Sequence, residues 1–155
     1  MPSSSGPRCR LLGRVPLFRD LDAAELALLA RYLHEFRCAP GAVLTQQGAP
    51  GDDFVGLIEG RVRVSTDATS LRDLGPGAHF GELALVSPAP RSTTVTALES
   101  CFGFRLSRAD YLDLCHRRPY LGQKISAAVL AAMAAMIRDL TERISGAERT
   151  LRGKA

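Results

Sequence analysis

The spacing of apolar residues divides the chain into three zones with different predicted structures. In the first zone, Asp22 and Glu25 have the spacing of a helical capping box. Apolar residues then recur with helical spacing at positions 26, 29, 33 and 36, and Pro40-Gly41 is a stop signal. This pattern predicts a helix that continues from the capping box to about Phe36.

The second zone, from Ala42 to Leu106, has the pattern of short β-strands. Residues 61–65 (RVRVS) alternate with a period of two, which predicts one wet face and one buried face. The pair Glu59-Gly60 precedes this run and is a tight hairpin signal. Two further strands are predicted over residues 92–98 and 101–106. Several short strands at this spacing favour an antiparallel roll or barrel.

The third zone returns to helical spacing. Ser107 with Asp110 forms a second capping-box pattern, and Pro119 can start a further helix over residues 120 to about 151. Apolar residues in this helix alternate steps of three and four, which makes an a/d seam: Leu130, Met133, Ile137, Leu140, Ile144, Ala147 and Leu151. The seam predicts a homodimer, with packing of the helix on its own domain as the alternative.

Together the three zones predict an α+β fold, with an antiparallel, jelly-roll-like β-roll flanked by an N-terminal helix and C-terminal helices. The 155 residues suffice for one domain of ordinary size. We expect a flexible tail over residues 1–14, a β-roll domain over 15–120, and a C-terminal lid and dimerisation helix over 121–152.

Composition adds few constraints to this picture. A net charge of +4 permits contact with an anion but does not argue for nucleic acid. The four cysteines have no C-x-x-C spacing, so scattered reduced thiols are expected rather than a disulfide framework. The first ten residues lack the apolar core of a signal peptide, and the apolar run over residues 125–137 is too short to span a bilayer. We therefore expect a cytoplasmic protein without a membrane span.

Residues 80–93 (FGELALVSPAPRST) contain the residues best suited to bind a ligand. Gly81 permits a close backbone approach, and residues 82–85 can form one helical turn whose N–H groups favour an anion. Arg91 follows a proline-rich loop that could fold back, and its guanidinium matches phosphate oxygens. Glu82 would then accept a hydrogen bond from a hydroxyl close to the phosphate, as on a ribose.

This stretch closely resembles the phosphate-binding cassette of the cyclic-nucleotide-binding domain family. The family pattern of F-G-E-L-A-L, four residues, and then P-R-S-x-T is met at residues 80–94. Upstream glycines and strand residues also match, and the resemblance extends over roughly residues 15–120. Members include catabolite activator proteins, kinase regulatory subunits and cyclic-nucleotide-gated channels. The resemblance implies a β-roll that binds cAMP or cGMP and needs no cofactor.

The resemblance also implies a role for each site residue. Glu82 would bind the ribose 2′-hydroxyl, and Arg91 would neutralise the cyclic phosphate. Backbone N–H groups of Gly81, Leu83, Ala84 and Ser92 would contact phosphate or ribose, and the Ser92 hydroxyl leaves cGMP open as a ligand. The remaining expected ligand-binding residues are Thr93 of the cassette, Val62, Val64 and Leu71 of the purine wall, and Leu130 and Met133 of an apolar lid.

The sequence therefore predicts a cyclic-nucleotide sensor that transmits its signal through the C-terminal helix to a downstream protein partner. A ligand-free dimerisation module with the same fold is the alternative. A DNA-binding regulator would need a recognition helix after the seam, which is not expected here. Catalytic and metal-ligating residues are not expected either, because His34, His79 and His116 are scattered. His79 is predicted to be a loop residue rather than a ligand contact.

Overall fold

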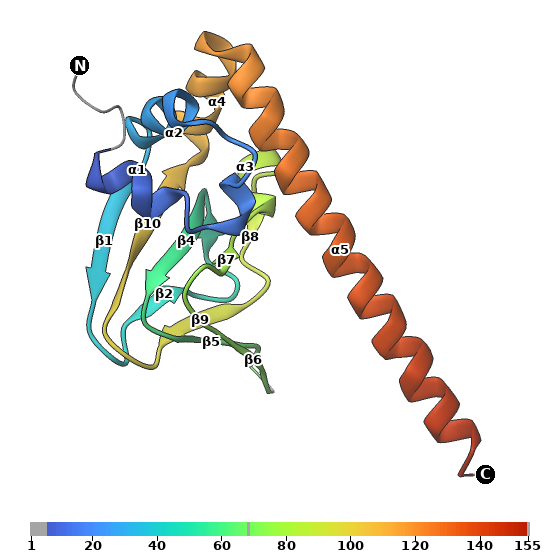
Figure 1. Cartoon of the computed structure of the whole chain (residues 1–155). Coiled ribbons are helices and arrows are strands. Elements are labelled where there is room, and N and C mark those ends of the chain that lie inside the picture. The colour runs from blue at the N-terminus through green and yellow to red at the C-terminus, as the bar shows by residue number, and fades with distance from the viewer. Residues whose placement is uncertain (1–5, 68, 155) are drawn as a thin grey trace.

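Helical elements from both ends of the chain gather at one end of a roll of short strands in the computed structural model, which describes residues 6–67 and 69–154 (Figure 1). The helical elements are α1 (Pro7–Leu12), the 3-10 helix η1 (Pro16–Phe18), α2 (Ala23–Ala30), α3 (Leu83–Val86), α4 (Arg108–Arg117) and α5 (Pro119–Arg152). The strands are β1 (His34–Cys38), β2 (Val43–Thr45), β3 (Pro50–Gly51), β4 (Asp53–Glu59), β5 (Val62–Ser65), β6 (Ser70–Leu74), β7 (His79–Phe80), β8 (Ala89–Pro90), β9 (Thr94–Ala97) and β10 (Cys101–Ser107).

The strands form two four-stranded sheets and a two-stranded ribbon, and every pair is antiparallel. The orders are β1-β10-β4-β7, β2-β9-β5-β6 and β3-β8. A buried cluster joins the two larger sheets, and we call it the roll cluster: Val55, Leu57, Val62, Val64, Phe80, Val95, Ala97 and Cys101. The predicted α+β class with an antiparallel β-roll is confirmed.

The turn at Glu59-Gly60 connects two sheets and does not form the predicted hairpin. Strand β4 pairs with β10 and β7, whereas β5 pairs with β6 and β9. Gly60 has a φ of 90°, and a Cβ on it would come within 2.4 Å of the Ser100 carbonyl oxygen. The signal for a tight turn was therefore correct, but the hairpin prediction was wrong because the chain changes sheets at this corner.

The N-terminal helix α2 is shorter than predicted. Its capping box is present, since the Asp22 carboxylate accepts from the Glu25 N–H (2.9 Å) and the Glu25 carboxylate accepts from the Asp22 N–H (2.8 Å). The helix ends at Ala30, and Phe36 belongs to β1, where it lies opposite Gly103. A Cβ on Gly103 would come within 2.7 Å of the Phe36 ring, so the strand pairing places the ring over the glycine. This tertiary contact overrides the helical spacing.

Residues 7–12, which were expected to lie in a flexible tail, form helix α1 instead. Cys9 and Leu12 are buried against the terminal helices, and Arg8 forms an ion pair with Glu35 of β1 (3.2 Å). The predicted tail is therefore wrong for this segment, because burial of the two apolar side chains fixes it. The part of that prediction that covers residues 1–5 lies outside the described residues.

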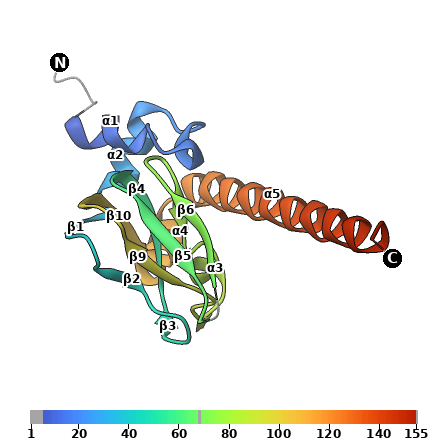
Figure 2. The same cartoon turned by 90° about the horizontal axis from the view of Figure 1, so that it is seen from below.

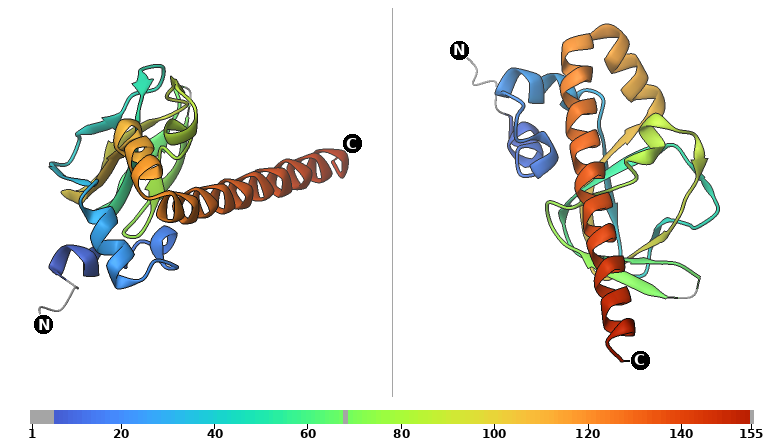
Figure 3. Two further views of the ribbon diagram at one scale, coloured as in Figure 1. Left: turned by 90° about the horizontal axis from the view of Figure 1, so that it is seen from above. Right: turned by 90° about the vertical axis from the view of Figure 1, so that its right-hand side faces the viewer.

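The C-terminal helices begin where predicted. The Ser107 hydroxyl caps α4 by accepting from the Asp110 N–H (3.0 Å), and Pro119 occupies the first turn of α5. Gly122 lets the two helices cross closely, since a Cβ there would come within 2.8 Å of the Cys115 Cα. One side of the first turns of α5 is buried, through Leu121, Gly122, Ile125 and Val129, and the helix then leads away from the roll (Figures 2 and 3). By length and composition alone α5 is also apolar enough to cross a membrane, which is weak evidence for a span.

Candidate functional site: a cationic loop on the roll

The residues of the cassette, 80–93, connect β7 to β9 through α3 and β8. Gly81 has a φ of 82°, a conformation that favours glycine. A Cβ on Gly81 would lie 2.6 Å from the Asp53 carbonyl oxygen and 2.7 Å from Arg91 Nη1. Glycine is therefore required for space as well as for backbone conformation, and the Arg91 guanidinium lies beside the Gly81 backbone.

One short backbone ladder, between residues 48–51 and 89–91, holds Arg91 in this place. Strand β8 pairs with β3, with Ala89 opposite Gly51. The Arg91 N–H donates to the Ala49 carbonyl (2.8 Å), and the Gly48 N–H donates to the Arg91 carbonyl (2.8 Å). A Cβ on Gly51 would lie 2.6 Å from Arg91 Cδ, so the arginine side chain crosses directly over that glycine. Arg91 is thereby 11% exposed in its side chain.

The buried guanidinium has a carboxylate partner, Asp53. Arg91 Nη2 donates to the Asp53 carbonyl (2.9 Å) and forms an ion pair with the Asp53 carboxylate. Arg105 Nη1 contacts the other carboxylate oxygen of Asp53 at 2.6 Å. Two cations thus share one carboxylate at a site where Asp53 is 17% exposed. Asp53 therefore offsets only one of the two guanidinium charges, which favours an anion beside the arginines. The other carboxylate of the cassette, Glu82, has its own partner.

Glu82 is buried, with 7% of the residue exposed, and its partner is His79 rather than Arg91. The His79 ring nitrogen Nδ1 pairs with Glu82 Oε1, and the ring packs against Phe54 with a centroid distance of 5.6 Å. His79 belongs to strand β7, so its prediction as a loop residue was wrong. A buried carboxylate requires a partner, and this requirement explains the contact.

Among the cassette residues expected to bind through their backbone N–H groups, one already has an intramolecular acceptor and two are exposed. The Ala84 N–H donates to the Gly81 carbonyl (3.1 Å), so an anion that binds there must share or replace this bond. Leu83 is exposed, and so is Ser92 after Arg91. The Thr93 carbonyl accepts from the Thr45 hydroxyl (3.3 Å), which attaches the end of the cassette to β2.

The predicted purine wall and lid are not equally close to the cassette. Val62 and Val64 are buried in the roll cluster, whereas Leu71 on β6 is exposed. Leu130 is 61% exposed. Met133 packs against a second buried cluster rather than the roll cluster; we call it the terminal-helix cluster, and its members include Leu12, Leu29, Leu114, Leu121 and Ile125. Phe80, the first residue of the cassette, therefore shares the roll cluster with Val62 and Val64, whereas Leu71 and the two lid residues lie outside that cluster.

Sequence reasoning missed Asp53 and the contact of His79 with Glu82. These partners could have been sought on physical grounds, because an arginine or a glutamate that is buried at a binding site needs an opposite charge nearby. The pair Asp52-Asp53 at the start of strand β4 offers such charges, but the sequence does not say which one turns toward Arg91. Among the described residues, no group of three potential ligands could hold a metal ion.

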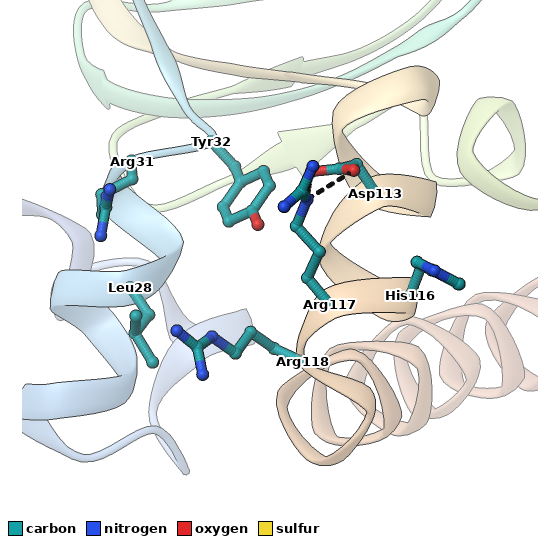
Figure 4. A pocket seen from close by; sticks show the side chains of 7 residues that line it. All are labelled: Leu28, Arg31, Tyr32, Asp113, His116, Arg117 and Arg118. Carbon is teal, nitrogen blue, oxygen red and sulfur yellow. Dashed lines mark hydrogen bonds and ion pairs between the residues drawn. The ribbon is translucent and has the colours of Figure 1, made fainter.

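A cavity of about 790 Å³ lies away from the cassette, between α2 and α4 (Figure 4). It is lined by Leu28, Arg31, Tyr32, Asp113, His116, Arg117 and Arg118. Figure 4 shows Arg117 directed toward Asp113, with which it forms an ion pair at 2.9 Å. The cavity shares no residue with the cassette, so its size does not identify the cassette's ligand.

Comparisons with known proteins agree with the geometry. A sequence model described as "Cyclic nucleotide-binding domain" matches residues 35–118. A cyclic nucleotide-gated potassium channel of Mesorhizobium japonicum is 40% identical over 114 residues, which cover 74% of this chain and 32% of the channel. A cAMP-dependent protein kinase regulatory subunit of Yarrowia lipolytica is 36% identical over 106 residues, which cover 66% of this chain and 28% of the subunit.

A solved structure supports the same assignment. The crystal structure of a cyclic nucleotide-binding domain from Methylobacillus flagellatus superposes with a TM-score of 0.79 at 26% identity, covering 88% of this chain and 80% of that one. The chain spans about a third of the length of the curated relatives it matches first. The agreement therefore concerns the domain and not the whole of any relative.

Proposed function

Since this chain belongs to the cyclic nucleotide-binding domain family, we propose that it senses a cyclic nucleotide, cAMP or cGMP, bound at the cassette. The observation that carries the proposal is the position of Arg91, a nearly buried cation beside the Gly81 backbone. A cyclic phosphate is a compact anion whose two free oxygens suit the arginine fork. Asp53 holds that fork in place before a ligand arrives.

Binding would redistribute the contacts of Arg91. The phosphate would take over part of its hydrogen bonding from the Asp53 carboxylate, which keeps its contact with Arg105 (2.6 Å). Glu82 would accept from the ribose 2′-hydroxyl while His79 stays paired with it. We expect the purine to contact the side of the roll that holds Val62 and Val64. Both side chains are already buried in the roll cluster, so this contact requires the cluster to open toward the base.

We further propose that α5 transmits the signal. In the structure Leu130 is exposed and Met133 lies on the terminal-helix cluster, so a lid made of these residues requires α5 to move toward the ligand. A bound purine favours the closed arrangement only if its affinity for that arrangement is higher. The exposed stripe farther along α5 would join two copies of the chain, and the closure would then change the geometry of the dimer for a downstream protein partner.

Relatives favour cAMP as the first ligand to test. The kinase subunit from Yarrowia lipolytica is named for cAMP, and a structure that shares 27% identity with this chain contains cAMP. Ser92 leaves cGMP as the second ligand. A cytoplasmic location, the lack of enzymatic activity and the lack of contact with nucleic acid remain predictions. A ligand-free dimerisation module is the alternative, favoured by the exposed stripe on α5 alone.

Calorimetric titration of cAMP and cGMP into the purified chain tests the proposal. We expect one ligand per chain and a loss of affinity in Arg91→Ala of about 2–4 kcal/mol, or roughly 30- to 700-fold. Arg117→Ala is the matched control, because it removes an arginine that also pairs with an aspartate but is 68% exposed and outside the cassette. Equal affinity in Arg91→Ala and the native chain would overturn the phosphate assignment.

Absence of binding by a folded sample would favour the dimerisation module. The sample must first be shown to carry no nucleotide, by the ultraviolet spectrum of its denatured supernatant. Unequal heats for cAMP and cGMP would identify the preferred base.

A further inference from the structure

Two cysteines face each other at one end of the roll. Cys38 is the last residue of β1, Cys101 is the first residue of β10, and the antiparallel register places them directly opposite each other. Both are free thiols in the structure. Residues directly opposite in an antiparallel pair project from the same face of the sheet, so the two sulfurs share one side of it.

The spacing of such a pair is close to that of a disulfide. Opposite residues in antiparallel strands have Cα atoms about 4.5–5.5 Å apart and Cβ atoms at similar distances. A disulfide needs Cα atoms within about 4.4–6.8 Å but Cβ atoms within about 3.5–4.5 Å. Bond formation would therefore require the strand ends to close by a fraction of an ångström to about one ångström, without a change of register.

The two thiols differ in access. Cys101 is buried in the roll cluster, and its Sγ donates to the Glu99 carbonyl at 3.3 Å. Burial, together with the neighbouring Cys38 thiol, raises the pKa of Cys101. Cys38 packs against the same cluster but is only half-buried, so it is the thiol that a small reagent can reach.

The other two cysteines lie elsewhere and do not compete for this partner. Cys9 and Cys115 both belong to, or pack against, the terminal-helix cluster. Cys115 lies against Gly122 at the crossing of α4 and α5, where a Cβ on the glycine would lie 2.8 Å from its Sγ. Cys38 and Cys101 therefore face each other across two paired strands, whereas Cys9 and Cys115 lie in a different part of the core.

We propose that Cys38 and Cys101 form a site of reversible thiol–disulfide exchange with a low-molecular-weight disulfide such as oxidised glutathione. The Cys38 thiolate attacks one glutathione sulfur, forms a mixed disulfide and releases one reduced glutathione. The Cys101 thiolate then attacks the Cys38 sulfur and displaces the second glutathione. Overall, two protein thiols lose two electrons and two protons, and oxidised glutathione becomes two reduced glutathiones.

The bond is expected to be reversible because the sheet opposes it. Drawing the Cβ atoms together strains the strand ends, and strained disulfides are reduced more readily than relaxed ones. The bond would also close a loop that contains the whole cassette, from Cys38 past Arg91 to Cys101. This inference does not depend on the binding of a cyclic nucleotide.

The test treats the folded, full chain with oxidised glutathione, blocks remaining thiols by alkylation, and measures intact mass and peptide maps. We expect the loss of two thiols, a mass lower by two hydrogens before alkylation, and one peptide that joins Cys38 to Cys101. Excess reduced glutathione should restore both thiols. Cys115→Ser is the matched control and should behave like the native chain, whereas Cys38→Ser should form no internal cross-link.

Three outcomes would overturn the proposal: a stable glutathione adduct on Cys38 with no internal bond, a cross-link that involves Cys9 or Cys115, or a Cys38–Cys101 bond that resists reduced glutathione. Because Cys101 is buried, its replacement could disturb folding. The half-buried Cys38 is therefore the position that decides the result, and a thermal unfolding curve verifies that Cys38→Ser is folded.

Discussion

The roll and the far part of α5 differ in how much of each apolar side chain is exposed. In the roll, Leu57 and Val62 are completely buried between two sheets. In α5, Ile137 and Ile144 are each more than 60% exposed, and they continue a stripe that begins at Leu130. The roll thus buries its own apolar surface, whereas the far part of the helix leaves an apolar stripe exposed, which is typical of a surface that binds a partner.

The largest expected effect is on the free energy of unfolding, to which the roll should contribute much more than the far part of α5. Leu57→Ala leaves a cavity in the roll cluster and should lower the free energy of unfolding by about 2–5 kcal/mol. Ile144→Ala removes a similar side chain from an exposed position and should change it by less than about 0.5 kcal/mol at low protein concentration. Urea unfolding followed by circular dichroism measures both, and equal losses would show that the far helix is part of the folding unit.

The second effect concerns self-association through the stripe. Ile137→Asp combined with Ile144→Asp places two charges on the seam and should weaken dimerisation by roughly 100-fold or more. Sedimentation velocity over a range of concentrations measures the change. The control is Ala135→Asp combined with Ser145→Asp, which adds the same two charges at exposed positions outside the seam. A native chain that stays monomeric at high concentration would contradict the dimer.

A smaller effect is expected on the ligand preference of the cassette. His79→Leu removes the partner of the buried Glu82 and should reduce the preference for cAMP over 2′-deoxy-cAMP by about 1 kcal/mol, roughly fivefold. His79→Gln retains a donor and should restore part of that preference. A merely structural role would weaken both ligands equally, so an unchanged ratio in His79→Leu, measured by calorimetry, would contradict the positioning of Glu82 by His79.

The same contrast explains what could be predicted from the sequence. The alternation of residues 61–65 predicts β5, and the a/d spacing after Leu130 predicts the apolar stripe of α5, because each pattern is local. Within the cassette, Gly81 and Arg91 were placed together because a short proline-rich loop joins them. These features depend on the spacing of near neighbours in the chain.

The rest depended on contacts between distant segments. Asp53 meets Arg91 across 38 positions of sequence, and nothing in the local pattern selects it over Asp52. Phe36 has helical spacing but joins β1, because its ring lies over Gly103 of a strand far along the chain. The strand change at Gly60 likewise follows from the packing of two sheets, which a turn signal cannot distinguish from a hairpin.

The smallest expected effect compares two glycines of α5, one where the helix packs against α4 and one in its exposed far part. A Cβ on Gly146 would meet nothing within 4 Å, so Gly146→Ala should stabilise the far helix by about 0.5–1 kcal/mol through reduced backbone entropy. A Cβ on Gly122 would lie 2.8 Å from Cys115, so Gly122→Ala should destabilise the crossing of α4 and α5.

Hydrogen exchange of the α5 amides measures the Gly146 effect, because a local gain in the exposed half need not change global unfolding. Slower exchange over residues 141–152 in Gly146→Ala, with unchanged dimerisation, would mean that the partner helix does not approach that glycine. If Gly146→Ala instead weakens the dimer, the second copy packs against Gly146, and the interface is wider than the a/d stripe.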